Sequence, residues 1–254
     1  MNRFLSDLVN AWRQTPLRRP PFFLLEDKAI LSNSFLHKFR NYKNFVNNPD
    51  FWTEQRDKLH TGLIPMPYSG DIKKAKIYVL ALNPGFSPQD YYAETYDDEL
   101  KRERIRELRQ EKLDKDYPFH HLNPTYSWSS GWRYWHSRFD SIVKQLSEQK
   151  NMHYVRALKL FSRNVACLEL VPYHSKNFYL PSKVVTSLQS VKLMKRFVQG
   201  YVWPRAKRGR AIIIVTRRVR LWDIPSHENV IQYSSGQARS AYFNSYRQKI
   251  IGML

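Results

Sequence analysis

The chain has 254 residues, of which 42% are hydrophobic and 15% aromatic, and its formal net charge is +20. Its single cysteine, Cys167, excludes a disulfide framework, a zinc knuckle and a four-cysteine iron–sulfur site, so we expect a reducing compartment and neither metal nor cofactor. No leader pattern is present, and no apolar run approaches the roughly 18 to 20 residues of a membrane span. We therefore expect a soluble, cytoplasmic protein that does not bind membranes.

Residues 1–65 show helical periodicity and predict a helical N-terminal extension packed on the core. One expected face carries Phe4, Leu8 and Trp12. A second set of apolar residues follows three- and four-residue steps: Leu31, Phe35, Phe39, Tyr42 and Val46.

The remainder of the chain, 66–254, alternates apolar strand patterns with helical ones. Four runs, at 75–82, 164–171, 210–216 and 228–233, have the continuous apolar character of strands buried on both faces. Helical stripes separate most of them: Trp132, Trp135, Phe139, Ile142 and Leu146, and later Leu188, Val191, Val198 and Val202. This alternation predicts an α/β domain with a mainly parallel sheet covered on both sides.

The segment 97–116 interrupts this pattern with eight acidic and seven basic residues. Opposite charges stand three and four residues apart and few positions are apolar, which predicts a solvated helix inserted at the surface. Folding over bound nucleic acid is the alternative for this segment.

The segment 170–222, in contrast, contains no acidic residue and indicates a surface that follows phosphates. A solvated basic face has the same composition. Because the net charge requires a polyanionic partner, DNA or RNA fits better than a membrane surface. The Lys and Arg residues lie at positions 176, 183, 192, 195, 196, 205, 207, 208, 210, 217, 218 and 220.

The first strand pattern ends at Asn83-Pro84-Gly85, where ligands gather in open α/β sheets. An uncharged amide can hold a water, proline fixes the backbone, and glycine lets a ligand approach closely. For the tripeptide taken alone, an ordinary Asn-Pro-Gly turn is the better explanation, and the sequence context decides between the two.

The chain resembles the uracil-DNA glycosylase superfamily, most closely its mismatch-specific uracil/thymine branch. "LNPGF" at 82–86 is similar to the first motif of that branch, while "PFHH" at 118–121 with "GWRYW" at 131–135 is similar to the second. "YSSGQARS" at 233–240 is similar to the closing loop. The sequence departs from the pattern at Ala81, where the family has glycine, in its closing loop, and in its unmatched N-terminal residues.

The resemblance implies a three-layer α/β/α fold with a central four-stranded, mainly parallel sheet, and a monofunctional glycosylase acting on a flipped base. Asn83 would hold the attacking water, and Pro84, Gly85 and Phe86 would border the base. Phe119 would stack on the base or pack in the core. The closing loop would contact DNA, with Arg239 entering the gap left by the base or binding phosphate; its other members are Ser234, Ser235, Gly236, Gln237 and Ala238.

Glu169 lies in an apolar run, where it either pairs with an arginine or reads the base. A carboxylate accepts well from the amino group of cytosine, which favours a cytosine-type base. Tyr173 and His174 follow at the expected pocket mouth, where His174 either meets leaving-group charge or a phosphate.

The departures from the uracil motifs resemble the phage-defence glycosylases of this superfamily, which implies a glucosylated hydroxymethylcytosine in phage DNA as substrate. The alternatives are a uracil/thymine mismatch repair glycosylase and a nonenzymatic nucleic-acid binding protein. A nuclease would need clustered carboxylates, and the strand ends carry only Glu169. We expect a monomer.

Overall fold

The computed structural model of the chain describes residues 2–37, 39–49, 51, 58–234 and 243–254. Its centre is a mixed sheet of five strands in the order β1-β3-β2-β4-β5. β1 runs antiparallel to β3, and the other neighbouring pairs are parallel. The strands are β1 (Tyr68–Ser69), β2 (Ile77–Ala81), β3 (Val165–Glu169), β4 (Ile212–Val215) and β5 (Val230–Gln232).

The four apolar runs of the sequence are the four parallel strands β2 to β5, which confirms the α/β prediction. The prediction of a four-stranded sheet is incomplete, because β1 adds an antiparallel strand at the edge. This strand has two residues, Tyr68 and Ser69, which pair with Leu168 and Cys167. So short a strand shows no periodicity, and only pairing with β3 defines it.

Helices lie in the connections between the four parallel strands. The α-helices of the described residues are α1 (Arg3–Arg13), α2 (Leu25–Lys28), α3 (Tyr42–Val46), α4 (Pro88–Tyr96), α5 (Asp98–Arg109), α6 (Ser130–Gln149), α7 (Tyr154–Ser162), α8 (Ser182–Ser187), α9 (Gln189–Phe197), α10 (Trp203–Lys207), α11 (Val219–Trp222) and α12 (Arg247–Ile251). A π-helix, η4 (Val198–Val202), joins α9 to α10. The 3-10 turns are η1 (Asn33–Phe35), η2 (His120–Leu122), η3 (Pro124–Tyr126) and η6 (Phe243–Tyr246).

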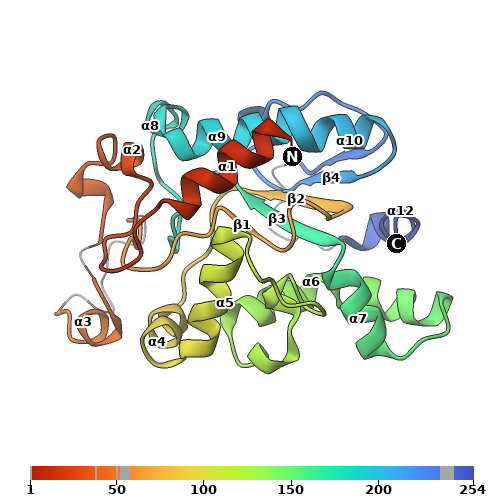
Figure 1. Cartoon of the computed structure of the whole chain (residues 1–254), viewed down its shortest axis with the longest axis horizontal. Coiled ribbons are helices and arrows are strands. Elements are labelled where there is room, and N and C mark those ends of the chain that lie inside the picture. The colour runs from red at the N-terminus through yellow and green to blue at the C-terminus, as the bar shows by residue number, and fades with distance from the viewer. Residues whose placement is uncertain (1, 38, 50, 52–57, 235–242) are drawn as a thin grey trace.

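Alternate residues of each central strand face opposite sides of the sheet. Tyr78 and Leu80 of β2 join one buried apolar cluster, with α1 and α9. Ile77 and Val79 join the other, with α6 and α7. Figure 1 shows α1, α9 and α10 on one side of the sheet and α6 and α7 on the other. Both faces of the sheet are therefore covered, which is why β2 and β4 are apolar at every position.

The first helix confirms the expected periodicity, since α1 buries Leu8 and Trp12. Both side chains belong to the same cluster as Tyr78 of β2. Fully burying a side chain such as Leu8 contributes about 1.5–3 kcal/mol, so this contact fixes the start of the chain to the core. The division between 1–65 and 66–254 as separate units stays a prediction.

The helix expected over 31–46 is wrong. Among the described residues of this range the helical elements are η1 and the short α3, and Leu36 forms a parallel bridge with Leu59. The side chain of Asn41 accepts a hydrogen bond from the backbone N–H of Asn44 and so begins α3. Local polar side chains and pairing with a distant segment override the apolar spacing.

The charged segment 97–116 is helical over α5, but the expectation of a solvated helix is wrong for one of its faces. Arg104 is 5% exposed and Glu107 is 2% exposed. Glu107 Oε1 accepts the backbone N–H groups of Gly70 and His120, at 3.0 and 3.1 Å. α5 therefore buries charge because its partners come from other parts of the chain.

Candidate functional site

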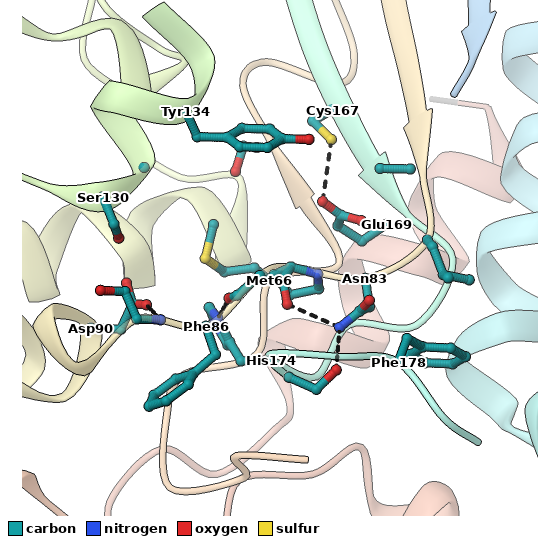
Figure 2. A pocket seen from close by; sticks show the side chains of 18 of the residues that line it. Met66, Asn83, Phe86, Asp90, Ser130, Tyr134, Cys167, Glu169, His174 and Phe178 are labelled. Atoms are coloured by element: carbon teal, nitrogen blue, oxygen red, sulfur yellow. Dashed lines mark hydrogen bonds between the residues drawn. The ribbon is translucent and has the colours of Figure 1, made fainter. Parts of the chain in front are cut away.

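A cavity of about 510 Å³ opens where β2, β3 and β4 end (Figure 2). Loops from these three strands and the first turn of α6 line it, as expected for an open α/β sheet. Its lining residues are Met66, Ser69, Ala81, Leu82, Asn83, Pro84, Gly85, Phe86, Ser87, Asp90, Arg104, His121, Ser130, Gly131, Tyr134, Trp135, Cys167, Glu169, His174, Ser175, Lys176, Asn177, Phe178, Thr216 and Arg217.

The side-chain amide of Asn83 lines this cavity in a fixed orientation. Its Nδ2 donates to the backbone carbonyls of Pro84 and Tyr173, at 3.0 and 3.3 Å, and to Ser175 Oγ at 2.9 Å. Backbone carbonyls only accept, so the nitrogen end of the amide must face them. Oδ1 accepts no hydrogen bond from the described residues and is left as the acceptor toward a ligand or water.

The loop after β2 is locked to the loop after β3. His174 Nδ1 lies 2.8 Å from the carbonyl oxygen of Gly85. The backbone N–H of Ser175 donates a hydrogen bond to the carbonyl oxygen of Pro84 at 3.2 Å. His174 Nε2 lies 3.2 Å from the carbonyl oxygen of Ile64. The structure thus brings together the two segments that the sequence singled out, 83–86 and 169–174.

Gly85 and Phe86 border the cavity in different ways. A Cβ atom on Gly85 would meet no heavy atom within 4 Å, so packing does not require glycine there. Phe86 stacks on the ring of His60 at a centroid distance of 3.6 Å, and His37 also stacks on His60, at 4.2 Å. Residues from the N-terminal part therefore support the cavity wall.

His60 is expected to act as a neutral, flat support for Phe86. Burial lowers the pKa of His60 to about 2, so the ring is uncharged at neutral pH. Because aromatic pairs contribute about 0.5–1.5 kcal/mol each, His60→Leu should lower the free energy of unfolding by about 1–3 kcal/mol. His60→Phe keeps both stacking contacts, so its free energy of unfolding should fall by less than that of His60→Leu. Urea unfolding of the two variants compares them, and equal losses would contradict the stacking role.

Glu169 enters the cavity from the last residue of β3 and is 8% exposed. Its Oε1 accepts a weak hydrogen bond from Cys167 Sγ at 3.5 Å. Burial raises the pKa of the Glu169 carboxyl to about 8, a rise that the Cys167 thiol and the charge of Arg217 only partly offset. In the parallel register Glu169 is opposite Ala81, so it lies close to Asn83 in the neighbouring loop (Figure 2).

Two predicted pocket residues do not line the cavity. Phe119 is fully buried and packs edge-on against Trp135 at 5.4 Å, so the core alternative describes it and the stacking role is wrong. Tyr173 is 1% exposed, and its hydroxyl donates to Asp27 Oδ2 at 2.7 Å. Tyr173 therefore ties α2 to the core, although its backbone carbonyl still holds Asn83.

The aromatic side chains that line the cavity, besides Phe86, are Tyr134, Trp135 and Phe178. Tyr134 and Trp135 belong to the "GWRYW" stretch that opens α6, and this motif was the available signal. Gly131 in the same turn is required by packing, because a Cβ there would meet His121 Nδ1 at 2.4 Å. The sequence offered no comparable signal for Phe178.

Charged groups also reach the cavity. Arg104 of α5 lines it while binding Asp90 and Glu94 at 2.9 and 2.7 Å. Of the Lys and Arg residues in the acid-free segment, Lys176 and Arg217 line the cavity, and both are exposed. The other basic residues of that segment lie on α8 to α11 and the adjoining loops, and all but positions 195 and 205 are exposed.

The closing loop is largely outside the described residues. Ser234 follows β5 and is exposed. The other predicted DNA-contacting residues, Ser235, Gly236, Gln237, Ala238 and Arg239, lie outside the described residues.

Within the part of the chain that the structure describes, no group of three or more His, Cys, Asp or Glu side chains is arranged to hold a metal ion. The helices described also include none with the length and apolar character to cross a membrane. Comparison with protein-family models, curated proteins and solved structures found no match for this chain.

Proposed function

We propose that the protein is a DNA glycosylase that flips a modified base out of DNA and hydrolyses its N-glycosidic bond, leaving an abasic site. The observation that carries this proposal is the fixed amide of Asn83, whose Oδ1 is available at a cavity shared with Glu169. The leading substrate is a glucosylated hydroxymethylcytosine of phage DNA, so the role would be antiviral defence.

The size and lining of the cavity suit an everted nucleotide. Ligand pockets usually have volumes of about 300–1,000 Å³, and this cavity has about 510 Å³. Flipping a base costs a few kcal/mol, which stacking on cavity aromatic rings and contacts to phosphates must offset. Tyr134, Trp135 and Phe178 supply rings, while Lys176 and Arg217 supply positive charge.

The chemistry assigned to Asn83 is positioning. Cleavage of a glycosidic bond passes through an oxocarbenium-like sugar, and water must approach C1′. Oδ1 would accept one hydrogen of that water and hold its oxygen toward C1′, because Nδ2 is already engaged by Pro84, Tyr173 and Ser175. Holding the water toward C1′ in this way requires no covalent bond between the sugar and the enzyme.

The proposal includes the three-layer α/β/α arrangement of the uracil-DNA glycosylase superfamily. Four parallel strands, with α1 and α9 against one face and α6 and α7 against the other, support it. The antiparallel β1 would then be an addition at the sheet edge.

The test is chemical. The protein is incubated with DNA carrying uracil, a thymine mismatch, 5-hydroxymethylcytosine or its glucosylated form, and each strand is then treated with alkali. Breaks that appear only after alkali in the glucosylated DNA are expected. Breaks confined to uracil or mismatched DNA would favour the mismatch-repair alternative. Intact strands with salt-sensitive retention would leave a nonenzymatic binder and contradict the proposal.

A further inference from the structure

The Glu169 carboxyl is a buried acid that forms no ion pair with any cation of the described residues. Its Oε2 has no hydrogen-bond partner, and no Lys, Arg or His side chain in the described ranges forms an ion pair with it. The contact of Oε1 with Cys167 Sγ, at 3.5 Å, is weak. Keeping a carboxylate buried without a partner costs several kcal/mol, so Glu169 holds its proton at neutral pH.

The titratable groups that face Glu169 do not change this state. Cys167 precedes it on β3, Tyr134 faces it from α6, and Arg217 follows β4. Burial raises the pKa of Cys167 and that of Tyr134, so both stay neutral near pH 7. Arg217 is exposed to solvent and forms no ion pair with Glu169. The cavity therefore contains a neutral carboxylic acid beside the Asn83 amide.

We infer that Glu169 is the general acid that protonates N3 of a departing cytosine-type base, an inference that rests on the glycosylase function proposed above. As the C1′–N1 bond breaks, its electron pair moves onto the base, and the Glu169 proton moves to N3. The base leaves neutral and Glu169 becomes a carboxylate. The oxygen of the water held by Asn83 bonds to C1′ and gives one proton to solvent, and Glu169 regains a proton from solvent.

This role discriminates between pyrimidines. Cytosine and its 5-substituted forms carry a lone pair at N3, whereas uracil and thymine carry a hydrogen there and have no acceptor to offer at that atom. The placement also fits, since Glu169 and Asn83 come from neighbouring parallel strands about 4.8 Å apart and can contact different ends of one nucleotide. Protonation removes the charge that makes an unmodified cytosine anion a poor leaving group.

The first experiment is a pH profile. Single-turnover excision of glucosylated 5-hydroxymethylcytosine by the wild-type protein should be constant below pH about 8 and fall about tenfold per pH unit above it. Glu169→Gln has the same shape but no acidic proton, so its rate should be about 10²–10⁴-fold lower and insensitive to pH over this range. Thermal unfolding of the variant at pH 6 verifies its fold. Should the variant not fold, the wild-type profile alone decides.

The second experiment removes the proton acceptor instead of the donor. In the 3-deaza analogue of the same base a carbon replaces N3, so the base has no atom there for Glu169 to protonate. Glu169→Gln should therefore lower the excision rate of this analogue by less than about threefold. Asn83→Ala, in contrast, should lower excision of both substrates, because it acts at the sugar.

The two proposals fail in different ways. Two outcomes would overturn the general-acid role and leave the glycosylase function standing, provided that the wild-type protein excises the base. In the first, Glu169→Gln excises the base as fast as the wild type. In the second, Glu169→Gln loses the same factor in rate on the base and on its 3-deaza analogue. Absence of excision from every DNA at every pH would overturn both. A wild-type profile without a fall above pH 8 would also overturn the general-acid role.

Discussion

Asn83→Ala should lower the rate of base excision by at least about a hundredfold while leaving the Kd for DNA within about threefold of the wild-type value. The reason is that Oδ1 is assigned to the attacking water, whereas the proposed contacts to DNA phosphates are assigned to other residues, Lys176 and Arg217 among them. Single-turnover kinetics measure the rate, and fluorescence anisotropy measures the affinity for substrate DNA.

Two variants control this experiment. Asn10→Ala makes the same truncation on the exposed face of α1 and should leave the rate unchanged. Asn83→Asp places a carboxylate oxygen against the carbonyls of Pro84 and Tyr173, where Nδ2 now donates, so we expect it to be less stable than the wild type by about 1–3 kcal/mol. Equal losses of rate and DNA affinity in Asn83→Ala would remove its assigned role.

Arg104→Met should have the largest effect on stability. Its guanidinium reaches from α5 to Asp90 and Glu94 of α4, and Glu94 in turn accepts a hydrogen bond from the backbone N–H of Ile64. Removing the cation leaves two buried carboxylates unpaired, which costs about 3–5 kcal/mol. For a chain of this size that corresponds to a fall in Tm of roughly 10 °C, measurable by calorimetry.

The same helix offers the matched control. Arg102 is exposed on α5, and Arg102→Met should change Tm by no more than about 1–2 °C. Arg104→Lys should fall between the two, since an ammonium cannot form the forked pair with Asp90 and Glu94. If Arg104→Met were as stable as Arg102→Met, the buried network would not support the cavity wall.

The sequence predicted the parts of the fold that depend on local patterning. The continuous apolar runs at 75–82 and 164–171 identified β2 and β3. The position of Asn83 just after the first run identified the edge of the sheet where it lies. Strand periodicity and the convergence of parallel strand ends depend only on neighbouring residues and sheet geometry. For this reason both cavity groups could be named in advance.

Only the tertiary structure decided which way the other candidates point. Tyr173 turns to Asp27, which lies 146 positions earlier in the chain, and Phe119 turns into the core against Trp135. In the same way, Arg104 in the charged segment is buried because Asp90 and Glu94 are packed opposite it. Side-chain direction in loops, and the pairing of charges, depend on partners from distant elements, and no local spacing encodes them.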